Sequence, residues 1–123
     1  MDIDPGKVVS EFVAAFAAKD IDRLALFLHP DVEFEAYGLT RATGREQTLA
    51  VWATTFATFA TVKFATVHQA VNGDVVLEEQ VHGLGLPGRP VALIKNVAVY
   101  RVRDGLITEW RDYTDATHAQ SLL

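Results

Sequence analysis

The sequence predicts an α+β fold in which helices pack against a strongly bent, mixed but mostly antiparallel sheet. Segments near the start of the chain and over 45–59 carry apolar residues three or four positions apart, as amphipathic helices do. Four later segments alternate apolar and polar residues and are separated by turns that contain glycine, as antiparallel strands are. No alternation of strand and helix appears, which disfavours a parallel doubly wound sheet.

Length and charge exclude several classes of protein. At 123 residues, half of them hydrophobic, the chain is long enough for a real core, and we expect residues 1–123 to form one domain. The formal net charge is −5 and no basic run appears, so we expect no nucleic-acid partner. No apolar segment reaches the length of a membrane-spanning helix, so we expect no membrane partner.

The chain contains no cysteine, which excludes disulfides, thiolate metal ligands and a cysteine nucleophile. Residues 1–5 are acidic and show no signal peptide, so a cytoplasmic location is expected. His29, His68 and His118 have no partner at metal-ligand spacing, and no glycine-rich phosphate loop precedes a helix. We therefore expect neither a metal nor a cofactor.

Helices are expected in three places. The first begins at Asp4, a good N-cap residue, with Pro5 in the first helical position, and ends near residue 19. A second follows and is expected to stop at the His29-Pro30 pair, because proline cannot continue the ladder of hydrogen bonds. After a strand over 31–37 and a loop over 38–44, a third helix is expected over 45–59.

Four strands are expected over 61–71, 75–86, 91–102 and 106–114, and together they form a meander. Alternate residues of a strand point to the same face. The even-numbered residues of the last three strands mix polar and apolar groups, which makes theirs the candidate inner face. The odd-numbered residues are also partly apolar, and this predicts a second copy of the chain against the outer face.

The Trp-Arg-Asp-Tyr-Thr-Asp stretch at 110–115 and this order of elements resemble the nuclear transport factor 2-like superfamily. The resemblance covers nearly the whole chain and is closest to the SnoaL-like polyketide cyclase and limonene-1,2-epoxide hydrolase-like branches. It implies a cone-shaped α+β barrel in which three N-terminal helices pack on the bent sheet. It also implies an apolar pocket, chemistry without a cofactor, and a homodimer through the outer sheet face.

The resemblance also assigns one catalytic role. Asp112 matches the aspartate that acts as acid and base in the hydrolase branch. That branch has an Arg-x-Asp pair where this chain has Gln80 and His82, and a water-holding Tyr-x-Asn where it has Phe34 and Ala36. Epoxide hydrolysis would therefore need an altered catalytic set.

The residues that remain favour proton transfer beside a carbonyl group, as in aldol-type cyclisation or isomerisation of an oxygenated apolar substrate. Burial in an apolar pocket raises the pKa of a carboxyl group, so Asp112 is the expected proton donor and acceptor. His82 is its expected catalytic partner, since the usual pKa of histidine lies near neutral pH. Asn96 can donate a hydrogen bond to a developing enolate.

Further side chains are expected to bind the substrate. With Asn96, these are Gln80, Phe34, Tyr37, Trp52, Phe56, Leu84 and Ile94. Aromatic residues at this spacing also form plain cores, His82 can instead face water, and Trp110 is expected to be structural. Two other functions stay open: an epoxide hydrolase with an altered catalytic set, and a ligand-binding module without chemistry.

Overall fold

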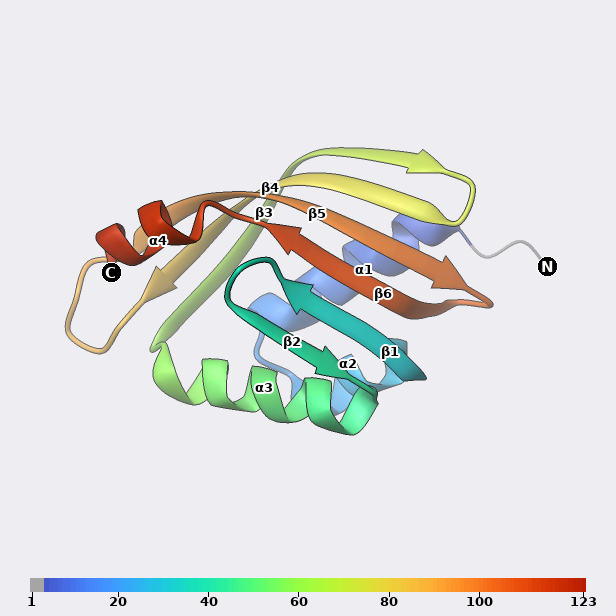
Figure 1. Ribbon diagram of the computed structural model, residues 1–123, viewed down its shortest axis with the longest axis horizontal. Coiled ribbons are helices and arrows are strands. Elements are labelled where there is room, and N and C mark those ends of the chain that lie inside the picture. Colours follow the sequence, from blue (N-terminus) through green and yellow to red (C-terminus); the bar gives the residue numbers. More distant parts are fainter. Residues whose placement is uncertain (1–3) are drawn as a thin grey trace.

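Three helices form where the apolar spacing predicts them in the computed structural model, which describes residues 4–123 (Figure 1). They are α1 (Pro5–Ala17), α2 (Ile21–Phe27) and α3 (Arg45–Thr58). The carboxylate of Asp4 accepts hydrogen bonds from the first backbone N–H groups of α1, as an N-cap does. The expectation about a signal peptide concerns in part residues 1–3, which lie outside the described range.

Three details differ from the sequence prediction. Helix α2 ends before His29 and Pro30, and both lie in strand β1 (Leu28–Ala36), because the chain is already extended at Leu28. The expected loop over 38–44 contains strand β2 (Thr40–Thr43), which pairs with β1 as a hairpin. A fourth helix, α4 (Ala116–Leu122), follows the last strand. The fold class itself, α+β with a mixed sheet, is confirmed.

The meander consists of β3 (Thr61–Asn72), β4 (Val75–Gly85), β5 (Ala92–Arg103) and β6 (Leu106–Tyr113). The six strands lie in the order β2-β1-β6-β5-β4-β3. Strand β1 runs parallel to β6, and all other neighbours are antiparallel. With β2 and β3 at its edges the sheet bends strongly without closing, so it is an open cone rather than a barrel (Figure 1).

Bulges and glycines accompany the bend of the sheet. A β-bulge interrupts β3 between Thr66 and His68, and bulges increase the local bend and twist of a strand. In β4, a Cβ atom added to Gly83 or Gly85 would lie 3.2–3.3 Å from side-chain carbons of Val91. Glycine at these positions therefore permits the close approach of the chain that enters β5.

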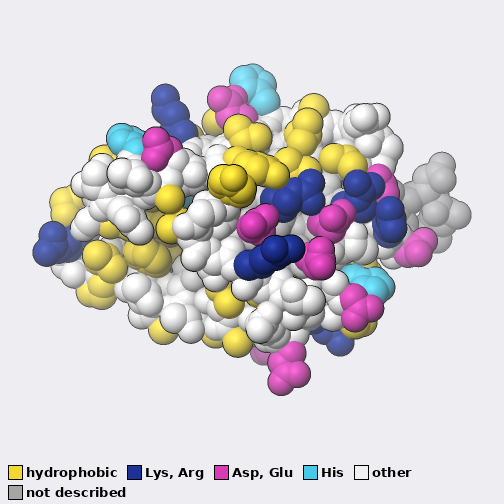
Figure 2. Space-filling view, viewed as in Figure 1, with side chains coloured by type: hydrophobic (Ala, Val, Ile, Leu, Met, Phe, Trp, Pro, Cys, Tyr) yellow, Lys and Arg dark blue, Asp and Glu magenta, His cyan; other side chains and the backbone are white. Residues whose placement is uncertain are grey.

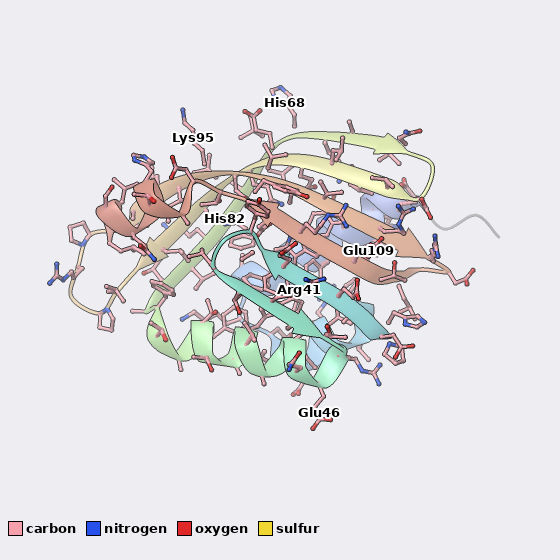
Figure 3. The ribbon with its side chains drawn as sticks, viewed as in Figure 1. Arg41, Glu46, His68, His82, Lys95 and Glu109 are labelled. Atoms are coloured by element: carbon pink, nitrogen blue, oxygen red, sulfur yellow. The ribbon has the colours of Figure 1, made fainter. Side chains whose placement is uncertain are left out.

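The two faces of the sheet divide as the alternation predicts. The even-numbered residues of β4, β5 and β6 are largely buried, among them Glu78, Gln80, His82, Ile94, Asn96, Trp110 and Asp112. On the outer face, Leu77, Leu93 and Val97 are exposed. Figure 3 shows Lys95 and His68 projecting outward from the sheet.

The aromatic core lies between the inner face and the helices. The ring of Phe12 in α1 packs against five other rings, with centroids 5.4–6.3 Å apart: Phe16, Phe27, Trp52, Tyr100 and Trp110. These rings fill the part of the concave side next to α1, whereas the part bordered by α3, α4 and the β1–β2 hairpin stays hollow. None of the helices in residues 4–123 is long and apolar enough to cross a membrane.

Candidate functional site

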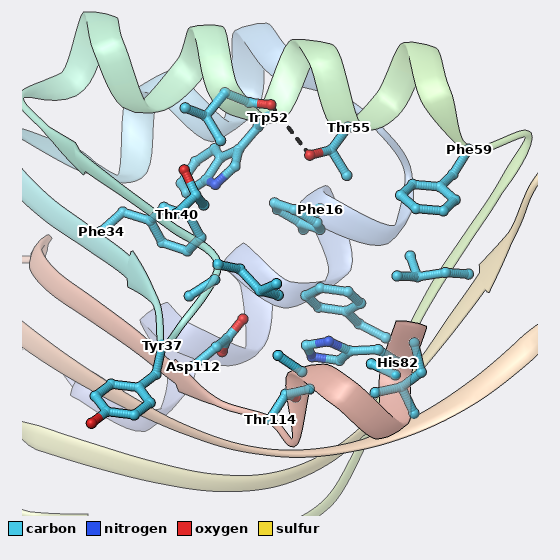
Figure 4. Close-up of a pocket in the computed structure, with 18 of the residues that line it drawn as sticks. Phe16, Phe34, Tyr37, Thr40, Trp52, Thr55, Phe59, His82, Asp112 and Thr114 are labelled. Atoms are coloured by element: carbon cyan, nitrogen blue, oxygen red, sulfur yellow. Dashed lines mark hydrogen bonds between the residues drawn. The ribbon is translucent and has the colours of Figure 1, made fainter. Parts of the chain in front are cut away.

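A cavity of about 330 Å³ lies between the inner face of the sheet, α3, α4 and the β1–β2 turn (Figure 4). Its volume is at the lower end of the range for small-molecule pockets. Most of the wall is apolar, and its aromatic members are Phe16, Phe34, Tyr37, Trp52, Phe59, Phe64 and Trp110. Polar groups are fewer: Thr40, Thr55, His82, Asp112, Thr114 and Gln120. The cavity therefore suits an apolar molecule that carries few polar atoms.

Asp112 lies on β6 with its carboxyl group turned into the cavity (Figure 4). Its Oδ1 accepts hydrogen bonds from Asn96 Nδ2 at 2.8 Å and Trp110 Nε1 at 2.7 Å. Among residues 4–123, no side chain or backbone group bonds to Oδ2. The second oxygen is therefore the one available to a bound molecule.

Burial raises the pKa of Asp112 to about 7, because the surrounding hydrocarbon disfavours the charged form. The hydrogen bonds from Asn96 and Trp110 act in the opposite direction but do not offset this loss of hydration. Near neutral pH the carboxyl group is therefore divided between its protonated and ionised forms. A group in that condition can both give and take a proton.

Asn96 and Gln80 connect Asp112 to the next strands. They face each other across β5 and β4, and Asn96 Nδ2 donates to Gln80 Oε1 at 3.2 Å as well as to Asp112. Asn96 Oδ1 accepts from the hydroxyl of Thr114 at 2.8 Å. His82 Nε2 lies 2.8 Å from the same Gln80 oxygen. His82 and Asp112 are therefore linked through two amides rather than by direct contact.

His82 does not titrate where the sequence analysis expects. Its ring stacks on Phe64, with centroids 3.7 Å apart and the planes nearly parallel. Burial lowers the pKa of His82 to about 4, because the imidazolium form loses its hydration. The alternative that His82 faces water is wrong, since the side chain is buried and lines the cavity. At neutral pH it offers a neutral imidazole.

A second buried carboxylate, Glu78, lies behind this group on β4. Gln80 Nε2 donates to Glu78 Oε1 at 2.8 Å and to the hydroxyl of Tyr100 at 3.0 Å. Thr66 also donates to Oε1, and Gln69 donates to Oε2. Alternation along this strand predicts Glu78 on the inner face beside Gln80 and His82, but it indicates no role for Glu78.

The structure brings most of the predicted site residues together. Besides Asp112 and His82, the cavity wall includes Phe34, Tyr37, Trp52, Leu84 and Ile94. Asn96 and Gln80 lie behind the wall, in the hydrogen-bonded group. The prediction for Phe56 is wrong, because Phe56 packs on the ring of Phe16, at 4.9 Å between centroids, and is not part of the wall.

Several residues of the site are missing from the sequence prediction. Trp110 packs in the core as expected, but its indole N–H also donates to Asp112, which its position two residues earlier on the same face could have indicated. Thr114 belongs to that face too. Ala119, Gln120 and Leu123 come from α4 or its end, for which no pattern was recognised.

The water-holding side chains of the hydrolase branch are replaced by hydrocarbon. Phe34 and Ala36 both line the cavity on β1, and neither can hydrogen-bond a water molecule through its side chain. Within residues 4–123, no three His, Cys, Asp or Glu side chains meet in a way that could hold a metal ion.

The shifted pKa values of Asp112 and His82 predict opposite effects of pH on stability. Asp112 binds its proton more tightly in the folded state, so its contribution is present below about pH 4 and is lost as the pH rises to about 7. The contribution of His82 is present above its usual pKa of 6.5 and is lost as the pH falls to about 4. These contributions amount to about 4 kcal/mol for Asp112 and about 3 kcal/mol for His82.

We therefore expect Asp112→Asn to raise the free energy of unfolding at about pH 8 and to make it fall on acidification below pH 6.5, the usual pKa of histidine. His82→Gln should show the reverse slope, with stability rising as the pH falls from about 7 to 4. Urea unfolding at several pH values measures both, and comparison with the wild type removes the titration of other carboxylates. Parallel curves for all three proteins would contradict the burial of both groups.

Solved structures of similar fold include an epoxide hydrolase and a candidate polyketide cyclase. An epoxide hydrolase of the limonene epoxide hydrolase-like type from M. tuberculosis is 25% identical over 97% of this chain and 88% of its own, with a TM-score of 0.86. A candidate SnoaL-like polyketide cyclase from Shewanella putrefaciens is 16% identical over 99% of this chain and 97% of its own, with a TM-score of 0.87.

A third similar structure carries a small ligand. It is a hypothetical protein with a ketosteroid isomerase-like fold from Catenulispora acidiphila, in complex with trimethylamine, and it is 24% identical over 94% of this chain and 90% of its own. Its TM-score is 0.86. The family model of the SnoaL-like domain matches residues 9–110, which is most of the chain. The chain therefore belongs to the SnoaL-like domain family, within the nuclear transport factor 2-like superfamily.

Proposed function

We propose that the protein is an enzyme that performs acid/base chemistry without a cofactor on an apolar, oxygenated small molecule. The observation that carries this proposal is the carboxyl group of Asp112, whose Oδ1 is held by two N–H donors while Oδ2 is left for a ligand in an aromatic cavity. Its pKa of about 7 suits a group that takes and returns a proton near neutral pH.

In the proposed reaction, ionised Asp112 removes a proton from a carbon beside a carbonyl group of the substrate. The electron pair of the broken C–H bond forms the enolate. In an isomerisation, Asp112 then returns the same proton to another carbon of the conjugated system. In an aldol-type cyclisation, the enolate carbon instead attacks a second carbonyl group, and the proton goes to the new alkoxide. Both versions leave Asp112 ionised, as it began.

Trp52 supplies a donor that the fold itself does not use. Its indole N–H is buried and has no hydrogen-bond partner among residues 4–123. The ring belongs to the cavity wall, and Figure 4 shows it on the side opposite Asp112. A buried donor left unpaired costs about 1–3 kcal/mol, and a substrate oxygen would remove that cost. We propose that Trp52 donates to the substrate carbonyl and thereby stabilises the enolate oxygen.

The proposed role of His82 is that of a neutral hydrogen-bonding group and not of a catalytic cation. Because its pKa lies at about 4, it is neutral at the pH where Asp112 works, so it does not act as an imidazolium acid. With Gln80 and Asn96 it forms a neutral hydrogen-bonded support for the carboxyl group. We propose that this support orients Asp112, while the hydrocarbon wall binds the apolar part of the substrate.

Epoxide opening is the second candidate, and the similarity to the M. tuberculosis hydrolase favours it. The apolar Phe34 and Ala36 weigh against it, because hydrolysis needs a positioned water. Incubation with a panel of apolar epoxides in water labelled with oxygen-18 distinguishes the two: label in a diol product supports hydrolysis. Binding of these molecules with no turnover of epoxides or enones would instead support a ligand-binding module.

Asp112→Asn tests the leading proposal. The amide keeps the shape of the side chain and can still accept from Asn96 and Trp110, but it cannot exchange a proton with the substrate. We expect kcat on any substrate found to fall by about 10²–10⁴. Circular dichroism serves as the control for folding. A variant that is folded and retains the wild-type rate would overturn the assignment.

Trp52→Phe tests the proposed carbonyl donor. The ring keeps most of its apolar contacts but loses the N–H, so binding of an oxygenated ligand should weaken by about tenfold. Binding of the matching hydrocarbon without the oxygen should change much less. Isothermal titration with the two ligands gives this comparison, and an equal loss for both would mean that Trp52 contributes only shape.

We also propose that two copies of the chain associate through the outer face of the sheet. Apolar side chains that are 44–66% exposed gather on this face: Val67, Leu77, Leu93, Val97 and Tyr113. Clusters of exposed apolar groups of this kind often mark protein–protein interfaces. Beside them lie charged side chains over β1, β2 and β6, which Figure 2 shows as mixed basic and acidic groups. The dimer implied by the sequence resemblance would cover the apolar cluster.

Analytical ultracentrifugation tests this association. The wild type should sediment as a dimer of 13.5 kDa chains. Leu93→Glu should shift it to the monomer, because burying the carboxylate in the interface costs free energy. Leu26→Glu is the matched control, since Leu26 is 77% exposed on α2 and away from the sheet face. A wild type that is monomeric at high concentration would contradict the proposal.

A further inference from the structure

Glu78 is a buried carboxylate that the proposed acid/base step does not use. It is 1% exposed, and none of the ion pairs within residues 4–123 involves it. Its oxygens instead accept hydrogen bonds from Gln80, Gln69 and Thr66. Burying a carboxylate is costly unless its oxygens accept hydrogen bonds. The side chains that donate to Glu78 are therefore strongly constrained in orientation.

Glu78 decides which way the amide of Gln80 points. Both oxygens of Glu78 accept hydrogen bonds from side-chain donors around them, so Gln80 turns Nε2 toward Glu78 and Oε1 toward Asn96 and His82. Since Oε1 can only accept, both neighbours must donate to it. His82 must then carry its hydrogen on Nε2. The 3.4 Å contact between Asn96 Nδ2 and His82 Nε2 is consequently a contact of two donors and not a hydrogen bond.

The orientation of Gln80 fixes that of Asn96, which in turn donates to Asp112. With one N–H on Gln80, its other N–H donates to Asp112 Oδ1, and its own oxygen accepts from Thr114. Trp110 donates to the same Oδ1. When Asp112 is protonated, both N–H groups occupy Oδ1, so the proton is held on Oδ2, the oxygen left for a ligand.

The other side chains in this series of hydrogen bonds do not fix which atoms donate and which accept. The hydroxyl groups of Tyr100 and Thr114 can donate or accept, and neutral His82 can carry its hydrogen on either nitrogen. Protonated Asp112 can itself donate. Without Glu78, both amides could therefore turn over while Asp112 is protonated, and Asp112 would donate from Oδ1 to the oxygen of Asn96. Its proton would then be hidden from the cavity.

We propose that Glu78 is a positioning residue, which fixes the direction of the hydrogen-bond chain through Gln80 and Asn96 and keeps the proton of Asp112 on its cavity-facing oxygen. The consequence for turnover rests on the proposed function. The direction of these hydrogen bonds does not rest on the proposed function. It also determines the tautomer of His82, which can be measured without a substrate.

The tautomer of His82 provides the test, read from long-range proton–nitrogen correlation spectra of nitrogen-15-labelled protein. At about pH 5.5, between the pKa values of His82 and Asp112 of about 4 and about 7, the imidazole is neutral and Asp112 is protonated. The wild type should carry the hydrogen on Nε2. In Glu78→Met, which removes the acceptor at similar length, the hydrogen should shift toward Nδ1. At about pH 8.5 ionised Asp112 again requires a donor, and the variant should return to Nε2.

Thr66→Val is the matched control, because it removes one hydrogen bond to Glu78 but leaves the acceptor in place. Its His82 should keep the hydrogen on Nε2 at both pH values. If Glu78→Met does not fold, Glu78→Gln keeps the volume and adds a donor, and a mixture of tautomers is expected.

Hydrogen on Nδ1 in the wild type would overturn the proposal without any variant. Hydrogen on Nε2 alone at pH 5.5, in either folded Glu78 variant, would overturn it too. Turnover by Asp112→Asn is a separate matter: a normal rate there would defeat the proposed function and leave the tautomer result standing.

Discussion

The carboxyl group of Asp112 is held away from bulk water, and the chemistry of the site depends on the free energy of that burial. Two N–H donors compensate one oxygen, while the other faces hydrocarbon and aromatic rings. The result is a pKa of about 7 rather than about 4. Ionising Asp112 within the fold costs free energy. Packing of the aromatic core around Phe12 stabilises the fold and offsets this cost. Such sites commonly exchange stability for reactivity.

The support behind Asp112 consists of neutral groups. Gln80 and His82 occupy positions where the resemblance to the hydrolase branch leads one to expect an arginine and a second aspartate. An amide and a neutral imidazole orient the hydrogen bonds to Asp112, and they add no positive charge that would lower the pKa of Asp112. Among residues 4–123, the one other carboxylate in this hydrogen-bonded group is Glu78, which lies at the far end of the two amides. The site is therefore tuned by desolvation and orientation rather than by ion pairing.

Local patterns in the sequence account for much of the fold. Helical spacing and the N-cap at Asp4 predicted α1, and alternation predicted the buried face that carries Asp112 and Asn96. The contact between Phe64 and His82 could not be predicted this way. Pairing continued from the turn at Asn72 would place Ala65 opposite His82, but the bulge in β3 shifts the register by one residue. No residue pattern marks that bulge.

By itself, the sequence determined the order of most elements and the inward face of three strands, because these depend on spacing along the chain. The proposed role of Asp112 came instead from the resemblance of the motif at 110–115. Only the tertiary structure decided that the concave side is hollow, that α4 helps to wall it, and that Glu78 lies in hydrogen-bonded series with Asp112. It also decided that His82 is neutral at pH 7. Cavities, pKa values and hydrogen-bond directions arise from groups distant in sequence, whose approach is set by sheet curvature and register rather than by local periodicity.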